Sequence, residues 1–391
     1  MEYSLNENKL TLNLSGRIDS NTSQKIEEEI SATIEGKTFD ELILDFENID
    51  FVSSAGLRVI LRFKKKYSSL RIINVVPEVY EVFEMTGFSE MMNIKKGFRR
   101  LTIGEGVEEI GRGANGIVYR YADDMIVKVY FNNAPLEDIK KEIALSKKAF
   151  VSGVSTAIPF DIVKVGPYYG SVFEMIKAES LSKLINKNPS KIDEYIDMIV
   201  ELLKTMNGNV IDDENVPTIK DKAILWLDKV VNEVSSEEMT KLRQLFDSIK
   251  DVNNMIHRDY HIKNLLMQQG ELILIDMDTL SRGSVLFELV GIYNAYKGFP
   301  VIRDKSESSF LGISDEVSYY IWERIFNLYF EGNSKEELEA IEEKIALVST
   351  VQLLKIHLKA SPVVSVGLDK KLTKLREKLH YLISKVDSLA I

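Results

Sequence analysis

The sequence predicts an α/β domain at its start, followed by a larger α+β region. Three observations predict this order. Strand and helix patterns alternate up to residue 98, strand patterns dominate 101–176, and helical periodicity dominates 177–391. A chain of 391 residues is long enough for two or three domains that each bury a core. We therefore expect domain boundaries near 98 and 176.

The first domain contains period-two strand patterns and period-four helix patterns. Polar and apolar residues alternate from Lys9 to Gly16, and Ile26, Ile30 and Ile34 recur every four residues after Asp19 and Ser20, either of which can cap a helix. We expect strands over 9–16, 41–46 and 70–75, and helices over 20–34, from 53 onward and from Pro77 to about Gly87.

The second region begins after a short basic run, Lys95 to Arg100, which we interpret as a solvated linker. Strands are expected over 107–111, 116–121, 125–130 and 169–173, with one helix over 136–151. Helices then dominate except near 257–280. One of them should begin at Ser334, which forms a capping-box pattern with Glu337.

Composition excludes several classes of function. The net charge of −10 argues against a nucleic-acid-binding protein, because binding to the phosphate backbone needs a basic face. The absence of cysteine excludes disulfides, thiolate metal sites and cysteine nucleophiles. The N-terminus lacks the pattern of a signal peptide, and no apolar run is long enough to span a membrane, so we expect a cytoplasmic protein.

A glycine-rich loop carries the first chemical signal. Gly111, Gly113 and Gly116 have the spacing G-x-G-x-x-G, and a strand pattern follows Gly116 where a dinucleotide-binding fold would have a helix. Glycines allow backbone amides to approach phosphates without side-chain clashes. An ordinary glycine-rich hairpin is the alternative.

Lys128 lies twelve residues after this loop, within an apolar strand pattern. A buried lysine needs a partner, and a phosphate together with a carboxylate would supply one. Glu142 is the preferred carboxylate because it lies in the middle of the following helix, whereas the rivals Glu137 and Asp138 lie near its start. The alternative is a solvent-facing lysine on an edge strand.

The strongest signal is the segment His257-Arg258-Asp259-Tyr260-His261-Ile262-Lys263-Asn264, followed by an apolar strand that ends in Asp276. Phosphoryl transfer needs a carboxylate beside the attacking hydroxyl and oxygen ligands for magnesium. Asp259 can supply the first, and Asn264 and Asp276 can supply the second.

These motifs, in this order, resemble the aminoglycoside phosphotransferase and choline kinase-like branch of the protein-kinase-like fold over about 105–390. The resemblance implies a two-lobed fold that holds ATP and Mg²⁺ between its lobes. It implies that the three glycines cover the phosphates and that Lys128, paired with Glu142, contacts them. Asp259 would be the catalytic base, Asn264 and Asp276 the magnesium ligands, and the backbone from Glu174 to Ile176 the adenine-binding segment.

Several departures from protein kinases imply a small hydroxylated acceptor. His261 stands where protein kinases usually have lysine, and too few residues separate Asp276 from Glu288 for an activation segment. About eighty residues before His257 allow a helical substrate subdomain. Relatives often have Asp near position 288, where this chain has Glu288.

Residues 1–98 resemble the STAS domain of anti-sigma factor antagonists through the segment Asp45 to Leu57 and through their strand–helix order. In that family a serine at the start of the following helix is phosphorylated, and alignment on Gly56-Leu57 puts Ser54 there. A phosphate is favoured at a helix N-terminus. The alternative is a plain helix cap.

The sequence thus predicts a STAS-like domain joined to a two-lobed kinase-like phosphotransferase, with a protein partner at the STAS-like domain. Two other functions stay open: a nucleotide-binding scaffold without turnover, and a protein kinase that acts on Ser54. The acceptor has no readable motif. The acidic cluster Asp212 to Glu214 would suit a cationic acceptor, or it is a solvated loop.

Overall fold

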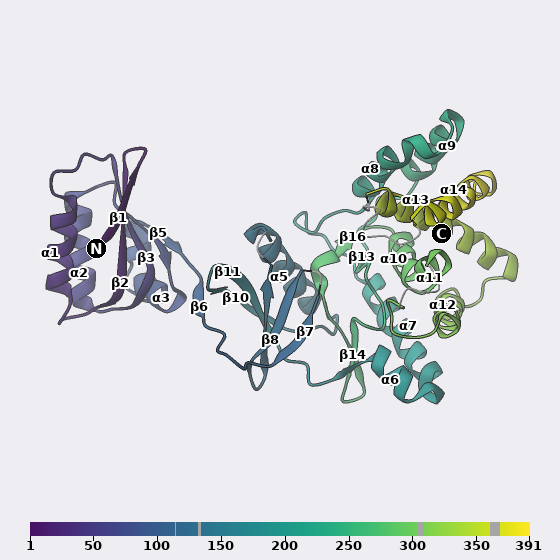
Figure 1. The fold of residues 1–391 in the computed structure, drawn as a ribbon, viewed down its shortest axis with the longest axis horizontal. Coiled ribbons are helices and arrows are strands. Elements are labelled where there is room, and N and C mark those ends of the chain that lie inside the picture. The colour runs from purple at the N-terminus through teal and green to yellow at the C-terminus, as the bar shows by residue number, and fades with distance from the viewer. Residues whose placement is uncertain (114, 132–133, 304–308, 360–367) are drawn as a thin grey trace. The chain divides into compact units, whose positions relative to one another are not determined.

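The structure is a computed structural model that describes residues 1–113, 115–131, 134–303, 309–359 and 368–391 (Figure 1). Contacts between Cα atoms divide the chain into two units. The first unit contains Met1–Ile139 and Phe160–Val172, and the second contains Lys140–Pro159 and Phe173–Ile391. The predicted domain boundaries near 98 and 176 stay predictions.

A five-stranded sheet forms the N-terminal part of the first unit. Its strands have the order β1 (Glu2–Asn6), β2 (Lys9–Ile18), β3 (Glu41–Val52), β4 (Arg71–Val75) and β5 (Asn93–Lys96). β1 pairs with β2 antiparallel, whereas β2 to β5 are parallel, so helices must connect them. These helices are α1 (Ser23–Ile34), α2 (Ser54–Lys66), α3 (Pro77–Met85) and the short α4 (Phe88–Met91).

Alternation in the strands builds the core of this sheet. Leu10, Leu12, Leu42 and Leu44 are completely buried, as the period-two pattern predicts. The helices α1 and α2 lie side by side (Figure 1), and Arg62 of α2 donates to Glu27 of α1.

One prediction for this part of the chain is wrong, and a second is right only in part. Neither Asp19 nor Ser20 caps α1, because the N-cap position is Thr22, and the Asp19 carboxylate instead accepts the Asn21 amide at 2.9 Å. The four basic residues of the run Lys95 to Arg100 are exposed and the run joins two sheets, as a solvated linker would, but most of it has strand structure. It supplies the end of β5 and the start of β6 (Arg99–Leu101), and Arg100 forms an ion pair with Glu47 at 3.0 Å.

A six-stranded sheet completes the first unit. Its order is β6, β10 (Pro159–Val165), β11 (Tyr168–Glu174), β9 (Met125–Tyr130), β8 (Gly116–Ala122) and β7 (Glu109–Arg112). The strands β7, β8 and β9 form an antiparallel meander that contains the glycine-rich loop. The helix α5 (Leu136–Val151) follows β9 and has the predicted bounds.

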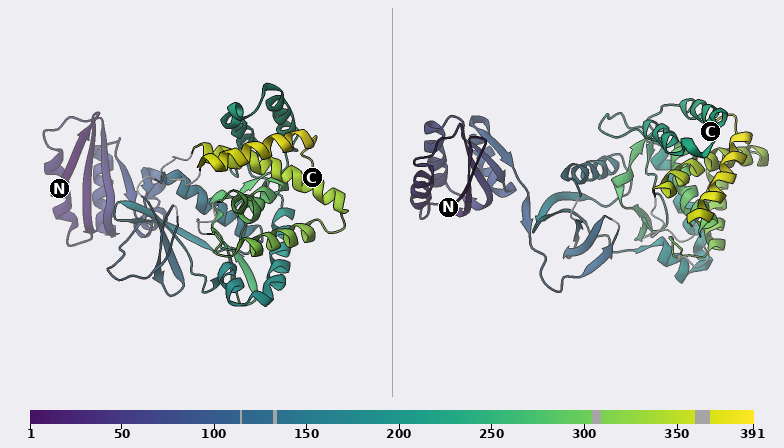
Figure 2. Two further views of the ribbon diagram at one scale, coloured as in Figure 1. Left: turned by 45° about the vertical axis from the view of Figure 1, so that its right-hand side comes forward. Right: turned by 45° about the horizontal axis from the view of Figure 1, so that its top comes forward.

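The rest of the second unit is mainly helical, as predicted. Figure 2 shows its teal, green and yellow helices gathered around a few short strands. The first of its elements are β12 (Glu179–Ser180), α6 (Leu181–Lys187), the 3₁₀ turn Pro189–Lys191, α7 (Ile192–Gly208), α8 (Lys220–Val230), the 3₁₀ turn Val231–Glu233 and α9 (Ser236–Asp247). The short strands are β13 (Met255–Ile256), β14 (Leu265–Gln268), β15 (Glu271–Leu274) and, after the 3₁₀ turn Met277–Thr279, β16 (Ser281–Arg282).

Five further helices close the second unit. They are α10 (Val285–Tyr293), which continues through a π-helical turn Asn294–Gly298, then α11 (Phe299–Ile302), α12 (Asp315–Tyr329), α13 (Lys335–Leu358) and α14 (Leu368–Lys385). The capping box at Ser334 and Glu337 is confirmed at the start of α13. α13 and α14 pack side by side, and Tyr260, Tyr296 and Trp322 are fully buried in this core.

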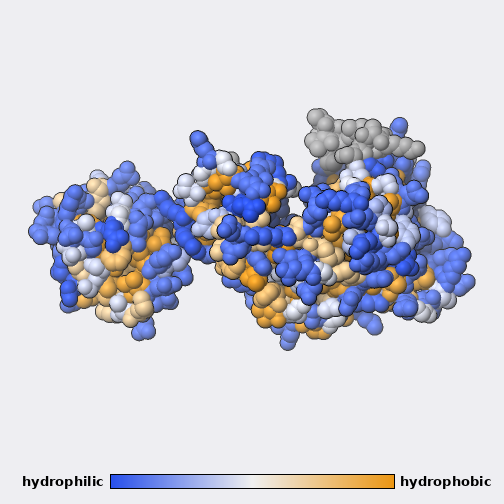
Figure 3. Space-filling view, turned by 90° about the horizontal axis from the view of Figure 1, so that it is seen from below, coloured by the Kyte–Doolittle hydropathy of each residue, from blue (hydrophilic) through white to orange (hydrophobic). Residues whose placement is uncertain are grey.

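The surface is largely hydrophilic, as a charged content of 28% leads one to expect. Figure 3 shows one face on which charged and polar side chains surround smaller apolar patches. Among the described helices, none combines the length and the apolar character needed to cross a membrane.

Candidate active site

The proposed catalytic loop is held in place by one buried carboxylate. Glu288, on α10, is completely buried, and its Oε2 accepts the backbone amides of both His257 and Arg258, the latter at 3.0 Å. Burial raises the pKa of Glu288 to about 7, although these two amides and Arg258 oppose the rise. The longer side chain at position 288 therefore reaches the loop, and the departure from Asp does not leave it without support.

Helix α10 approaches the same loop closely. Arg258 has a left-handed backbone with φ of 69°, and a Cβ added at Gly291 would lie 2.4 Å from the Arg258 carbonyl oxygen. Only glycine allows this approach without movement of the loop.

Asp259 lies among groups that favour its ionised form. The Asn264 side-chain amide donates to Asp259 Oδ2 at 3.0 Å, and His261 Nε2 lies 3.2 Å from Asp259 Oδ1. Burial alone would raise the pKa of Asp259, but these groups, together with His257, hold it below its ordinary value. Asp259 is thus a carboxylate at neutral pH, able to accept a proton.

His257 supports the loop as a neutral ring. It is completely buried, and burial lowers its pKa to about 4. Its Nδ1 accepts the Asp259 amide at 3.3 Å, so the ring hydrogen belongs on Nε2, and its carbonyl accepts the Thr279 hydroxyl at 2.6 Å.

Asn264 and Asp276 are brought together by the backbone. The Ile275 amide donates to the Asn264 carbonyl at 2.9 Å, which sets the next residue, Asp276, beside the loop. Asp276 is exposed and has a left-handed backbone with φ of 68°. The Asn264 amide nitrogen is used by Asp259, so the oxygen of that side chain is the part suited to a cation.

This donor set fits magnesium better than a softer metal. Magnesium prefers oxygen and usually takes one or two protein ligands, with phosphates and water completing its shell. Asn264 and Asp276 match that pattern. Among the described residues, no three His, Asp or Glu side chains lie close enough together to bind a metal ion. The described residues therefore form no site in which protein side chains alone would complete the metal's coordination shell.

The glycines of the loop between β7 and β8 differ in their surroundings. A Cβ at Gly116 would lie 2.3 Å from the Val129 carbonyl oxygen, so glycine is required for β8 to approach β9. At Gly111 and Gly113 nothing lies within 4 Å of the added Cβ. The space where a side chain would lie at these two positions is open, so a ligand could approach the backbone there. Ala114, within the same motif, lies outside the described residues.

Lys128 belongs to the first unit and Glu142 to the second. Lys128 lies between the buried Val127 and Val129 on β9, so alternation turns it to the opposite side of the strand. On α5, Glu142 is buried with 6% exposure, whereas Glu137 and Asp138 are exposed. A buried carboxylate needs a cation or donors, which supports the choice of Glu142 over its rivals.

The predicted adenine-binding segment follows β11. The Glu174 amide donates to the Ile158 carbonyl at 2.9 Å, and the Ile176 carbonyl accepts the Ala178 amide at 2.9 Å. These bonds give the segment a defined path between β11 and β12.

A cavity of about 480 Å³ opens beside Asp259. Its wall includes Phe299, Arg303, Phe310, His357 and Lys371. Sequence reasoning placed the acceptor pocket only broadly, in the helical insert and the C-terminal helices, and named none of these five residues. They are scattered over the end of the sequence and form no motif, so no local signal could have found them.

Ser54 is exposed and is the first residue of α2, but it is not the cap. The cap is Ser53, whose Oγ accepts the amides of Ala55 at 3.2 Å and Gly56 at 3.5 Å. The plain-cap alternative for Ser54 is therefore wrong, and the Ser54 hydroxyl is left for another use.

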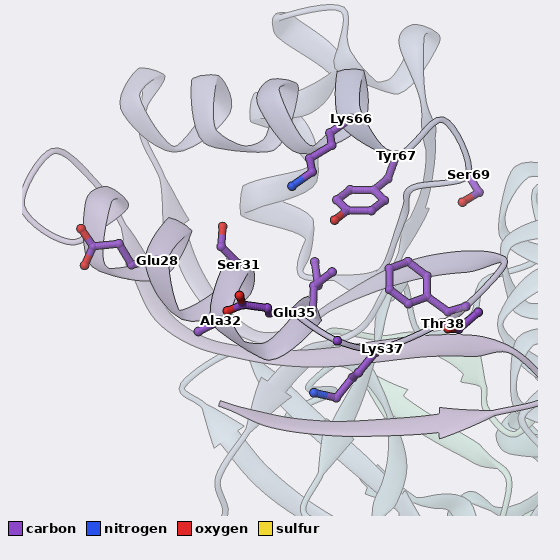
Figure 4. A pocket seen from close by; sticks show the side chains of 12 residues that line it. Glu28, Ser31, Ala32, Glu35, Lys37, Thr38, Lys66, Tyr67 and Ser69 are labelled. Atoms are coloured by element: carbon purple, nitrogen blue, oxygen red, sulfur yellow. The ribbon is translucent and has the colours of Figure 1, made fainter.

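The first unit also has a wide hollow of about 830 Å³ near the ends of α1 and α2 (Figure 4). Its wall includes Lys37, Lys66 and Tyr67. Lys66 ends α2 and Ser54 begins it, so a helix of 13 residues, or about 18 Å, separates the hollow from Ser54. We assign the hollow no role in the phosphotransfer site.

Two family models match the chain in sequence. Residues 2–101 match the STAS domain, and residues 106–305, about half of the chain, match the phosphotransferase enzyme family. The chain belongs to the phosphotransferase enzyme family. It carries a STAS domain at its N-terminus, and the predicted family and fold class are confirmed.

Curated relatives match the STAS domain. The anti-sigma F factor antagonist of Paenibacillus polymyxa is 30% identical over 89 residues, which are 22% of this chain and 76% of that protein. A protein of Bordetella bronchiseptica named as an anti-sigma factor antagonist, BtrV, is 34% identical over 79 residues, which are 19% of this chain and 67% of that protein.

Solved structures similar to this chain include an aminoglycoside phosphotransferase and an amicoumacin kinase. The ADP-bound aminoglycoside phosphotransferase APH(2'')-Ib has a TM-score of 0.48 and 12% identity, and the match covers 78% of this chain and 98% of that one. The amicoumacin kinase hAmiN, in complex with AMP-PNP, Ca²⁺ and Ami, has a TM-score of 0.48 and 15% identity, and the match covers 78% and 94%.

Proposed function

We propose that this phosphotransferase moves the γ-phosphoryl group of ATP to a hydroxyl of a small molecule with the help of Mg²⁺. The observation that carries the proposal is the position of Asp259. This ionised carboxylate is fixed by Asn264 and His261 and borders a cavity large enough for a small acceptor.

The residues act as follows in this proposal. The acceptor hydroxyl lies in the cavity and gives its proton to Asp259 while its oxygen forms a bond to the γ-phosphorus. The bond between that phosphorus and the bridging oxygen breaks, and ADP leaves. Asn264 and Asp276 would hold magnesium, which would supply neutralisation of the phosphate charge. His257 and Glu288 take no proton in this step and hold the loop in position.

ATP binding is assigned by the resemblance to the phosphotransferase family, residue by residue. We assign Gly111, Gly113 and Gly116 to the phosphates, Lys128 with its carboxylate Glu142 to the same phosphates, and the backbone from Glu174 to Ile176 to adenine. A protein that uses ATP and magnesium fits the cytoplasm.

The test is ADP release by the full chain over aminoglycosides, choline, ethanolamine, sugars and nucleosides, with and without EDTA. Asp259→Asn should lower turnover by about 100- to 10,000-fold, since it removes the base. Asp276→Ala should abolish magnesium-dependent turnover, since it removes one of the two proposed magnesium ligands. The exposed Asp251→Asn is the matched control and should leave turnover unchanged. Magnesium-dependent turnover that survives both site substitutions would contradict the proposal.

We propose further that the STAS domain docks a protein partner and regulates the phosphotransferase, with Ser54 as its phosphorylation site. The exposed Ser54 hydroxyl at the start of α2, released from capping by Ser53, favours this use. Mass spectrometry of the protein after growth in its host tests the site. Peptides that cover residue 54 and never carry phosphate would exclude it.

A further inference from the structure

We infer that Tyr296 is a positioning residue for the phosphotransfer proposed above, on which this inference rests. Its hydroxyl holds the catalytic loop through the backbone of Ile262, whose amide donates to the hydroxyl oxygen at 3.0 Å. Ile262 stands between the proposed base and a proposed magnesium ligand, three residues after Asp259 and two before Asn264. A shift of this backbone would therefore move both functional side chains.

The hydrogen bond between Tyr296 and Ile262 is shielded from water. Tyr296 is 1% exposed and Ile262 is completely buried, so water cannot replace the hydroxyl if it is lost. Burial also raises the pKa of Tyr296, so the hydroxyl stays neutral at physiological pH. The Ile262 carbonyl accepts the Ser182 amide at 3.1 Å, and both backbone groups of Ile262 are thus fixed.

Tyr296 lies in the π-helical turn Asn294–Gly298, which joins α10 to α11. The Phe299 amide donates to the Asn294 carbonyl, five residues earlier, which is the spacing of a π turn. Such turns are rare and occur frequently at functional sites. The contacts that hold this turn decide where the Tyr296 hydroxyl lies.

Side chains of α12 and α13 hold the turn in place. The Ser349 hydroxyl donates to Asn294 Oδ1 at 2.5 Å, and the Asn294 side-chain amide donates to Gln352 Oε1 at 2.7 Å. The Ser318 hydroxyl donates to the Tyr296 carbonyl at 2.8 Å. Ser318 and Ser349 are both buried. The turn is therefore fixed by buried hydrogen bonds on the side chain of its first residue and on the backbone of Tyr296.

The helix and its π turn support the loop on both sides of Asp259. Glu288, on α10, accepts the Arg258 amide at 3.0 Å, just before Asp259. Tyr296 accepts the Ile262 amide, just after it. With a support on each side, the loop resists turning about one end, and the Asp259 carboxylate keeps its direction.

The same turn forms part of the cavity beside Asp259. Ala295, within the turn, and Phe299, the first residue of α11, line that cavity. The turn thus links a wall of the acceptor cavity to the loop that carries the base. Misplacement of reacting groups by about 1 Å can lower the rate about 100-fold. Loss of the hydroxyl should therefore slow the reaction more than it weakens ATP binding.

The test compares two variants that each lose one buried hydroxyl. Tyr296→Phe keeps the ring and removes the bond to the loop. Tyr293→Phe is the matched control, because Tyr293 lies on α10 with 3% exposure and its hydroxyl accepts from Lys378 of α14 at 2.9 Å. Both variants should be less stable than wild type, and only Tyr296→Phe should disturb the loop.

Two measurements on the full chain follow the loop and the reaction separately. Hydrogen exchange, read by mass spectrometry over 259–264, should be about tenfold faster at Ile262 in Tyr296→Phe and unchanged in Tyr293→Phe. ADP release is measured over a range of ATP concentrations with magnesium and with water as the acceptor. Tyr296→Phe should lower kcat about tenfold or more while the KM for ATP changes less than about twofold. Tyr293→Phe should leave both values unchanged.

A second pair of variants serves if Tyr296→Phe does not fold, which thermal unfolding without ligand would show. Ser349→Ala removes a hydroxyl that holds the turn through Asn294, and it should lower kcat about threefold or more at an unchanged KM. Thr350→Val is its matched control. Thr350 is equally buried on the same helix, and its hydroxyl donates to the Ala346 carbonyl of that helix at 2.7 Å.

The outcomes separate this inference from the phosphotransfer itself. A folded Tyr296→Phe variant with wild-type exchange at Ile262, or with the kcat of Tyr293→Phe, would overturn the inference. So would equal kcat values for Ser349→Ala and Thr350→Val where that pair is used. A wild-type chain that releases no ADP with water or with any screened acceptor would contradict phosphotransfer. Exchange at Ile262 would then decide alone whether Tyr296 holds the loop.

Discussion

Replacing Glu288 with glutamine should change how the stability of the second, mainly helical unit depends on pH. The carboxyl has an ordinary pKa of 4.5 and a pKa of about 7 in the folded chain. The unfolded state therefore loses its proton first as the pH rises, so this group disfavours folding increasingly between pH 4.5 and 7. At 1.36 kcal/mol per pKa unit, the full penalty is about 3 kcal/mol. Glutamine keeps an oxygen for the two loop amides and has no charge to bury.

The assay is urea unfolding of both proteins at pH 5, 6, 7 and 8, followed by tryptophan fluorescence. Both tryptophans, Trp226 and Trp322, are buried in the second unit, so their fluorescence reports on the unfolding of that unit. We expect the free energy of unfolding of wild type, minus that of Glu288→Gln, to fall by about 2–3 kcal/mol from pH 5 to pH 8. His257, whose lowered pKa gives the opposite trend at acid pH, is present in both proteins and cancels in the difference.

The exposed Glu331→Gln serves as the control and should show no such trend. A wild-type-minus-Glu288→Gln difference that stays constant within about 0.5 kcal/mol, or that grows with pH, would refute the reasoning. It would mean that the buried carboxyl is solvated or paired in a way that the hydrogen bonds to His257 and Arg258 do not show.

Three further predictions follow from single contacts. Gly116→Ala should lower the melting temperature of the first unit, because the added Cβ would lie 2.3 Å from a backbone oxygen. Gly113→Ala, whose Cβ enters open space, should leave the melting temperature unchanged but weaken ATP binding, as measured by calorimetry. Ser53→Ala should cost about 1 kcal/mol in urea unfolding as a lost cap, whereas an equal loss for Ser54→Ala would contradict the cap assignment. Gly291→Ala should lower kcat far more than it raises the KM for ATP, because the added Cβ would displace the Arg258 carbonyl and with it the loop that carries Asp259. Unchanged kinetics would show that this loop can move without loss of activity.

Much of the fold could be predicted because its signals are local. β9 and α5 have the predicted bounds, since alternation and helical periodicity act within a few residues. β1 was missed because all of its residues are exposed, so burial leaves no pattern in it. β6 and β10 were missed because a parallel pair between distant segments has no local signature, and basic residues such as Arg99 and Arg100 look like a linker until they are paired.

The proposed site likewise has parts that could be predicted from local sequence and parts that depend on contacts between distant residues. The loop from His257 to Asn264 is one contiguous motif, so its chemistry could be predicted from spacing alone. The role of Glu288 as acceptor for two loop amides depends on a contact about thirty residues away, which only the structure provides. The cavity lining comes from elements as distant as α11 and α14, and neither charge nor periodicity links Arg303 to Lys371 in the sequence.

The left-handed backbones of Arg258 and Asp276 have a consequence for evolution and for protein engineering. A side chain in this conformation costs roughly 1–2 kcal/mol, and glycine would relieve that cost at both positions. Selection for stability alone would therefore drift toward glycine, as would a redesign that scores only the fold. A chain that keeps an arginine and an aspartate there has retained a less stable backbone, and glycine scanning of these two positions would measure how much stability is given up for the chemistry.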